Sequence, residues 1–318
     1  MTYKVLITDN LSPQSLVILE EADDATFDVV TGLTPETLAE RIPEYDALIV
    51  RSSVTVTEEV FAAASKLKAV GRAGVGVDNI DIDAASKQGV IVMNTPGANT
   101  IATAEHTLAL MLALCRHLPQ AYTTLQAGKW NRKSYMGRQL YQKTLGLIGM
   151  GRIGSQVALR CQAFEMDVVA YDPYLSDEIA QKFNIKLVDL NELLDQADFI
   201  SLHAAYTEQT AKIINHETIA QMKDGVRIVN AARGALIDEA ALVEGVKSGK
   251  IAGAALDVFV DEPLPKDSIL LGIDNIILTP HLAASTLEAQ QFVGIQVIEQ
   301  ILDGLRGQGF RNALNMPA

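Results

Sequence analysis

Three side chains with complementary chemistry each follow a run of β-branched and aliphatic residues. Arg233 follows VRIVNAA, Glu262 follows ALDVFVD, and His281 follows IILTP. In an open parallel sheet the carboxyl ends of the strands share one edge, and ligands bind there. Each residue alone also fits a structural role: a helix-capping arginine, an acid in a loop, or a histidine bonded to backbone. Together they would place a guanidinium, a carboxylate and an imidazole at one ligand-binding edge.

A glycine-rich turn earlier in the chain has the spacing G-x-G-x-x-G. Gly149, Gly151 and Gly154 lie directly after the apolar run LGLI and at the start of a helical pattern. The motif alone is weak evidence, but this strand, turn and helix context strengthens it. The first glycine would permit a tight turn, the second would let backbone approach a pyrophosphate, and the third would let helix pack on strand. We therefore expect a dinucleotide-binding loop, with a structural glycine turn as the alternative.

An acidic residue at the end of the next predicted strand bears on which dinucleotide binds. Asp172 lies 23 positions after Gly149, close to the separation typical of this motif. Its carboxylate would accept hydrogen bonds from ribose hydroxyls and repel a 2′-phosphate. The flanking residues YDPY contain no arginine to compensate a phosphate. This favours NAD over NADP, although an aspartate before proline is also common in surface turns.

The elements that position these residues are indicated by an alternating hydrophobic pattern. Short runs such as KVLIT, ALIV and DFISLH alternate with helical patterns, which is typical of βαβ units and parallel sheets. The turn cluster NTPGANT separates two such series near Pro96, and one long helix is expected after it, over residues 100–126. We predict an α/β fold of two doubly wound parallel-sheet domains, Rossmann- or flavodoxin-like, with an interdomain cleft.

The domain boundaries follow from the same pattern. The helical segment near residues 285–305 follows the last predicted strand, so it can return to the first domain. We expect a substrate-binding lid domain over residues 1–96 plus 286–318 and an NAD-binding Rossmann domain over 97–285.

The composition excludes other classes of protein. The 318 residues include 26 Lys and Arg against 39 Asp and Glu, and the net charge of −13 would repel nucleic acids and anionic membrane surfaces. An anionic ligand would therefore need a local cluster of basic residues. Cys115 and Cys161 lack paired or metal-binding spacing, so we expect neither a disulfide framework nor a metal site. The N-terminus lacks a signal-peptide pattern, which favours a cytoplasmic location.

A set of longer motifs resembles the D-2-hydroxyacid dehydrogenase family and covers most of the chain from residue 44 to 290. They occur in the family's order: GRAGVGVDNID, NTPGANTIATAEHTLALML, GKWNRKSYMG, KTLGLIGMGRIG, VNAARGALID, GAALDVFVDEP and PHLAAST.

The resemblance implies roles for the three strand-end residues. Arg233 in AARG, Glu262 in DEP and His281 in PHLAAST match the family's catalytic residues. His281 would act as general base toward the substrate hydroxyl, Glu262 would orient it, and Arg233 would bind the substrate carboxylate. The resemblance also implies NAD contacts in addition to the three glycines and Asp172. These are Arg152, Ile153, His203, Ala204, Ala231 and Asp257.

The resemblance is strongest to members that oxidise D-3-phosphoglycerate to 3-phosphohydroxypyruvate, at the entry to serine synthesis. It implies substrate contacts at Arg51, Ser52, Arg72, Val75, Gly76 and Arg132, although exposed cations are also common without function. A glyoxylate or hydroxypyruvate reductase is the alternative enzyme, and an NAD-sensing corepressor is an alternative of another class. A homodimer is expected. The residues after Leu305 are too few for a separate serine-binding domain, so we expect no allosteric response to serine.

Overall fold

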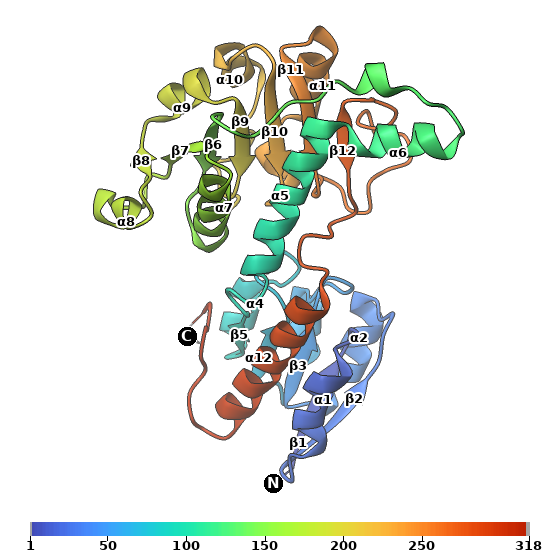
Figure 1. Cartoon of the computed structure of the whole chain (residues 1–318). Helices are drawn as coiled ribbons and strands as arrows, with labels where there is room; N and C mark the ends of the chain where they lie inside the picture. The colour runs from blue at the N-terminus through green and yellow to red at the C-terminus, as the bar shows by residue number, and fades with distance from the viewer. Residues whose placement is uncertain (1, 316–318) are drawn as a thin grey trace. The chain divides into compact units, whose positions relative to one another are not determined.

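A computed structural model describes residues 2–315. The predicted domains also include Met1 and residues 316–318, which lie outside the described residues. The chain divides into two compact units, residues 1–99 with 285–318 and residues 100–284 (Figure 1). Each contains one parallel sheet covered by helices, which confirms the predicted α/β class of two parallel-sheet domains. No helix within the described residues is long and apolar enough to cross a membrane.

The first unit has five parallel strands in the order β2-β1-β3-β4-β5. Its strands are β1 (Tyr3–Ile7), β2 (Ala25–Val29), β3 (Ala47–Val50), β4 (Ala69–Arg72) and β5 (Ile91–Met93). Its helices are α1 (Pro13–Glu20), α2 (Pro35–Arg41), α3 (Glu58–Ala63), α4 (Ile82–Lys87) and α12 (Leu287–Leu305). Apolar clusters cover both faces of this sheet, as the near-continuous aliphatic runs of its strands require.

The last helix, α12, packs on β4 of this sheet. Val297 and Ile301 of α12 are fully buried, and a Cβ on Gly71 of β4 would lie 2.6 Å from Cγ2 of Val297. The glycine therefore lets the helix lie close to the strand immediately before Arg72.

The second unit has seven parallel strands in the order β12-β11-β10-β9-β6-β7-β8. Its strands are β6 (Thr144–Ile148), β7 (Asp167–Tyr171), β8 (Lys186–Leu187), β9 (Phe199–Leu202), β10 (Val226–Asn230), β11 (Ile251–Leu256) and β12 (Ile276–Leu278). Its helices are α5 (Thr100–Arg116), α6 (Leu118–Gln126), α7 (Arg152–Ala163), α8 (Asp177–Lys182), α9 (Leu190–Gln196), α10 (His216–Gln221) and α11 (Glu239–Ser248). The strand order reverses beside β6, which pairs with both β7 and β9. Ligands bind at such switch points, and the glycine-rich turn follows β6.

One long helix was expected over residues 100–126, and this expectation is wrong. The structure has two helices, α5 and α6, separated at His117, whose φ of 51° is left-handed. The physical reason is Pro119, which lacks the N–H that a continuous helix would donate to the Cys115 carbonyl and whose ring would clash with that carbonyl, whereas a proline in the first turn of a new helix is tolerated.

Candidate active site

The centre of the candidate site is a contact between two of the predicted residues, His281 and Glu262. Nδ1 of His281 lies 2.7 Å from Oε2 of Glu262, and Oε1 of Glu262 accepts a hydrogen bond from the Phe259 backbone N–H at 3.0 Å. The His281 side chain is 51% exposed, so solutes can reach the ring. With Nδ1 directed at a carboxylate, Nε2 is the ring nitrogen that can exchange a proton with a bound molecule.

The backbone that carries His281 has a strained conformation and is held by a buried acid. His281 has a φ of 52°, which is uncommon outside glycine. Asp257, 0% exposed and directly after β11, accepts hydrogen bonds from the N–H groups of Leu282 and Ala283, both at 2.8 Å. It also accepts one from Oγ1 of Thr279 at 2.6 Å, and its own carbonyl accepts the His281 N–H at 2.9 Å. These bonds determine the loop that presents the imidazole.

The pKa of Asp257 lies below its ordinary value. Burial is the largest contribution and raises the pKa, but hydrogen bonds from His106, Thr279, Leu282 and Ala283 lower it by more in total. Asp257 is therefore ionised near neutral pH. His106 on α5 lies with Nε2 3.3 Å from a carboxylate oxygen of Asp257 and 3.3 Å from Oγ1 of Thr279. Sequence reasoning gave His106 no role, since on a buried helix it had no signal beyond its residue type.

Arg233 lies just beyond β10 on a turn that an asparagine stabilises. The buried Asn230 accepts from the Ala232 N–H at 3.0 Å and donates from Nδ2 to the Arg233 carbonyl at 2.8 Å. The Arg233 guanidinium donates to the Ala232 carbonyl at 2.7 Å. A glycine next in the chain, Gly234, is required because a Cβ there would overlap the Phe259 backbone.

That close contact joins two of the predicted site loops. The Phe259 backbone beside Gly234 also donates to Glu262, which in turn contacts His281. The loop of Arg233 and the loop of Glu262 are therefore adjacent at the carboxyl edge of one sheet. The structure thus brings together the segments that carry Arg233, Glu262 and His281, as expected for residues that follow neighbouring parallel strands.

In the glycine-rich turn, two glycines are required by close contacts within the protein, whereas the third has open space beside it. Gly149 has a φ of +91°, and a Cβ there would lie 2.6 Å from the Ala204 backbone nitrogen. A Cβ on Gly154 would overlap the Gly149 carbonyl oxygen. A Cβ on Gly151, which caps α7, would meet no atom of the described residues within 4 Å. Open space beside the first amides of a 12-residue helix fits the pyrophosphate of a dinucleotide.

The acidic residue after β7 is connected to the same turn. Asp172 accepts hydrogen bonds from the Met150 N–H at 2.9 Å and the Tyr174 N–H at 3.0 Å, one on each carboxylate oxygen. Each oxygen retains a second lone pair, so the carboxylate can still accept from ribose hydroxyls. The arrangement fits an unphosphorylated adenosine ribose.

His203 directly follows β9, beside this turn. Its Nε2 lies 2.8 Å from Oγ of the buried Ser201, and burial lowers the pKa of His203 to about 4. The ring is therefore neutral near neutral pH and adds no positive charge to the pocket. Among the other residues expected to contact NAD, Arg152 is exposed, Ile153 and Ala204 are half-buried, and Ala231 is buried.

The residues expected to bind an anionic substrate lie mainly in the first unit. Arg51 follows β3, where its N–H donates to Asp9 at 2.8 Å and its carbonyl accepts from Asn79 at 2.8 Å. Ser52 is exposed, while Arg72, Val75 and Gly76 are half-buried at the end of β4 and beyond it. Arg132 belongs to the second unit and is exposed on a short 3-10 turn. Sequence reasoning missed the asparagines that hold these loops.

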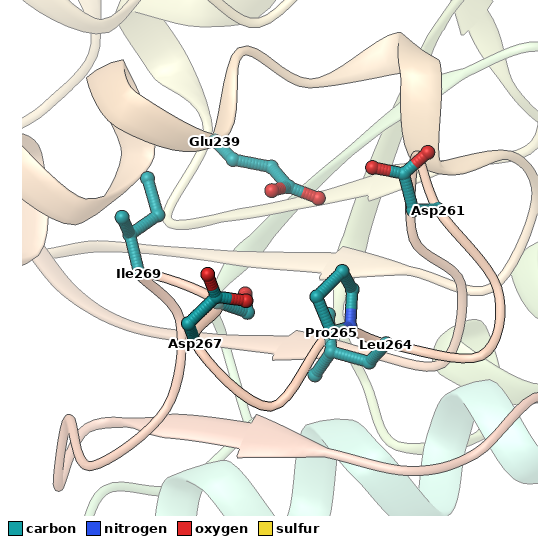
Figure 2. Close-up of a pocket in the computed structure, with 7 residues that line it drawn as sticks. Glu239, Asp261, Leu264, Pro265, Asp267 and Ile269 are labelled. Carbon is teal, nitrogen blue, oxygen red and sulfur yellow. The ribbon is translucent and has the colours of Figure 1, made fainter.

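A cavity of about 230 Å³ in the second unit is lined in part by Asp261, the residue before Glu262, but its lining differs chemically from the candidate site. Glu239, Asp261 and Asp267 direct carboxylates toward it (Figure 2). Such a lining repels an anionic dinucleotide or hydroxy acid. Among the described residues, no three or more His, Cys, Asp or Glu side chains are placed so that they could hold a metal ion together.

Comparisons with known proteins identify a family to which the chain is similar. Residues 108–283 match the family model "D-isomer specific 2-hydroxyacid dehydrogenase, NAD binding domain". A D-3-phosphoglycerate dehydrogenase from Methanocaldococcus jannaschii is 53% identical over 315 residues, which are 99% of this chain and 60% of that protein. The chain thus spans about 60% of the length of this relative.

Solved structures are also similar to this chain. The TT0316 protein from Thermus thermophilus has a TM-score of 0.91 at 35% identity, with 98% of this chain and 100% of that chain covered. D-lactate dehydrogenase from Aquifex aeolicus, solved with NAD and lactic acid, has a TM-score of 0.85 at 31% identity, with 99% and 100% covered.

Proposed function

This chain belongs to the D-isomer specific 2-hydroxyacid dehydrogenases, and we propose that it oxidises D-3-phosphoglycerate to 3-phosphohydroxypyruvate. Residues 108–283 are the NAD-binding domain of that family, and NAD is the cofactor. The observation that carries the proposal is the contact of His281 with Glu262 on this domain, in a chain half identical to a phosphoglycerate dehydrogenase.

Each catalytic side chain then has a defined task. Nε2 of His281 takes the proton of the substrate hydroxyl, and Glu262, bound to Nδ1, keeps the ring oriented and stabilises the imidazolium that forms. Arg233 binds the substrate carboxylate by charge-assisted hydrogen bonds. When bound, NAD supplies the hydride acceptor. Oxidation releases one proton to His281, which must pass to solvent before the next turnover, and the exposure of the ring permits this.

Most of the residues that would hold the cofactor follow β6, β7 and β9, at the switch point of the second sheet, and two follow β10 and β11. The open space at Gly151 and the α7 N-terminus suit the pyrophosphate, and Asp172 suits the ribose. The remaining proposed contacts are Gly149, Arg152, Ile153, Gly154, His203, Ala204, Ala231 and Asp257.

The residues proposed to bind substrate include three arginines in a chain of net charge −13. Arg51, Arg72 and Arg132 would bind the phosphate side, with Ser52, Val75 and Gly76 contributing polar and backbone contacts. A phosphate carries about −1.5 to −2 charges, which explains why several guanidinium groups would be needed.

Steady-state kinetics test the proposal. Oxidation of D-3-phosphoglycerate, D-lactate and D-glycerate is measured with NAD and with NADP, and reduction of glyoxylate and hydroxypyruvate is measured with NADH. We expect the highest kcat/KM for 3-phosphoglycerate with NAD. A higher value for any unphosphorylated acid would replace the assigned substrate.

We further propose that the protein is a homodimer in the cytoplasm. Helix α6 and the segment after it carry large apolar side chains that are 53–84% exposed: Leu118, Tyr122, Leu125, Trp130 and Met136. An apolar surface of this kind is typical of an interface. Both cysteines are free and buried, which suits a reducing compartment. Light scattering tests the oligomer: wild type should have twice the mass of the chain, and Leu125→Glu should shift it toward monomer.

A further inference from the structure

A buried polar side chain in the first unit has no role in the function proposed above. Gln300 on α12 is 1% exposed, although it lies among the fully buried apolar residues Val297, Ile298 and Ile301. A buried carboxamide costs free energy unless it is hydrogen-bonded. Its Nε2 donates to the Asn94 carbonyl at 3.0 Å, and its Oε1 accepts from Nδ2 of Asn312.

The bond to Asn94 reaches the segment directly after β5, the last strand in its sheet. Residues near the C-terminus pair with the outer edge of β5: Met93 forms an antiparallel bridge with Ala313, and the Asn94 N–H donates to the Asn312 carbonyl at 3.5 Å. The Asn94 carbonyl bonds to a side chain instead. Gln300, 206 residues further along the chain, supplies the donor. The carboxamide therefore fixes the backbone just past the carboxyl end of β5.

That backbone in turn holds the loop after β4. Nδ2 of Asn94 donates to the Val75 carbonyl at 2.7 Å. The buried Thr95 donates to the Gly74 carbonyl twice, from its N–H at 2.9 Å and from Oγ1 at 3.2 Å. Two consecutive carbonyls of the loop are thus bonded to two consecutive residues that Gln300 positions.

The held loop determines where the Arg72 guanidinium lies. Gly74 has a φ of +152°, and its N–H donates to the Arg72 carbonyl at 2.9 Å. A Cβ on Gly74 would overlap the Arg72 guanidinium, which therefore lies directly over the glycine. A shift of Gly74 would shift the surface against which the guanidinium packs.

We propose that Gln300 is a positioning residue for the substrate-binding loop 72–76, acting through Asn94 and Thr95 on Gly74 and Val75 and so on the Arg72 guanidinium. The inference rests on the proposed function only in taking Arg72 as a substrate ligand. Its structural part, that Gln300 orders the loop, is independent of the substrate.

The test uses an isosteric pair of variants on one helix. Gln300→Met keeps the length of the side chain but removes its hydrogen bonds to Asn94, Asn312 and Gln296. Gln296→Met, one turn earlier, is the matched control, because Gln296 contacts Gln300 at 3.5 Å but not Asn94. We expect Gln300→Met to raise the KM for 3-phosphoglycerate about tenfold, equivalent to about 1.4 kcal/mol, with kcat and the KM for NAD changed less than about twofold. Gln296→Met should leave all three near wild type.

A double-mutant cycle separates positioning from a general effect on stability. In an Arg72→Ala background, Gln300→Met should change KM by less than about twofold, because the group it positions is gone. A tenfold effect that persists in that background, or no effect on KM in wild type, would overturn the inference. If Gln300→Met does not fold, Gln300→Glu takes its place in the same cycle, with the same expectations, because it keeps Oε1 for Asn312 but loses the donor to the Asn94 carbonyl.

Hydrogen–deuterium exchange of the free protein gives a readout that needs no activity. Peptides covering residues 72–76 and 94–95 should exchange faster in Gln300→Met than in Gln296→Met. Equal exchange would refute the ordering role even if kinetics changed. If wild type does not oxidise 3-phosphoglycerate, the proposed function fails by itself, and faster exchange in Gln300→Met would still support the role of Gln300 in the loop.

Discussion

The loop that carries His281 and the loop that carries Arg72 are each held by a buried polar side chain, but the chemistry of the two differs. Asp257 is ionised and accepts from two backbone N–H groups and a hydroxyl, all within 26 residues of itself. Gln300 is neutral and both donates and accepts, with its Asn94 partner 206 residues away. A carboxylate suits a loop whose free groups are donors, whereas an orphan carbonyl needs the donor that an amide supplies.

The difference has a functional consequence. The His281 loop must hold a proton-transferring atom, where a small displacement lowers the rate, and strong charge-assisted bonds hold it. The Arg72 loop holds a long flexible cation that binds an anion, and neutral bonds are sufficient. We therefore expect damage to the first loop to lower kcat and damage to the second to raise KM.

The largest effect should come from the imidazole itself. His281→Asn keeps a residue that tolerates left-handed backbone, so the loop is preserved while the base is lost. We expect kcat to fall by roughly 10²–10⁴-fold, the range for loss of a general base. His216→Asn, at an exposed position, is the control. A decrease in kcat of less than about tenfold would exclude His281 as the base.

Removal of the charged group beneath that loop should destabilise the domain. Asp257→Ala leaves the Leu282 and Ala283 N–H groups without their acceptor, at about 1–3 kcal/mol for a buried group such as the Ala283 N–H and less for the partly exposed Leu282. We expect the free energy of unfolding, from urea titration, to fall by about 3 kcal/mol, and kcat to fall with it. If stability falls but kcat per folded molecule is unchanged, the loop does not depend on Asp257 for its catalytic position.

Loss of the Arg72 guanidinium should affect substrate binding alone. Arg72→Ala removes one charge-assisted contact, worth about 1.5–3 kcal/mol, or roughly ten- to over a hundredfold in KM for 3-phosphoglycerate. Kinetics with D-lactate provide the comparison, and the KM for this unphosphorylated acid should change much less. An equal change for both acids would assign Arg72 to the carboxylate side.

Cofactor preference should respond to Asp172 to a smaller extent. Asp172→Ser relieves repulsion of a 2′-phosphate but also loses ribose hydrogen bonds, so we expect the ratio of kcat/KM for NAD over NADP to fall by about tenfold. Asp177→Ser, on the exposed first turn of α8, controls for a general change in charge. If wild type uses the two cofactors equally, Asp172 does not discriminate between them.

The smallest effect should be a pH dependence that distinguishes the two buried side chains. The pKa of Asp257 is lower in the folded protein than its ordinary value of 3.8, so its ionised form stabilises the fold above that value. That contribution is lost as pH falls through the lower, folded pKa. The stability difference between wild type and Asp257→Asn should therefore shrink on acidification below pH 3.8, whereas that between wild type and Gln300→Met should not. If the stability difference between wild type and Asp257→Asn stays constant on acidification, the pKa of Asp257 is not lowered by folding.

Much of this site was predictable because its signals are local. The glycine turn, Asp172 and the three strand-end residues each depend on a short strand, turn or helix pattern, and parallel strands bring their carboxyl ends to one edge. The two parallel-sheet domains could be predicted from the alternation of short apolar runs with helical patterns along the chain. The single helix over residues 100–126 failed where Pro119, also a local signal, was given too little weight.

What the sequence by itself determined is therefore the fold class, the family and the residues at the strand ends. Only the tertiary structure decided which oxygen of Glu262 contacts which nitrogen of His281, and that His106 contacts Asp257. It also decided that Gln300, a polar residue among apolar helix positions, has partners at Asn94 and Asn312. The physical reason is that backbone conformation depends on near neighbours in the chain. The partner of a buried polar group depends on how distant elements pack, and no local pattern encodes that partner.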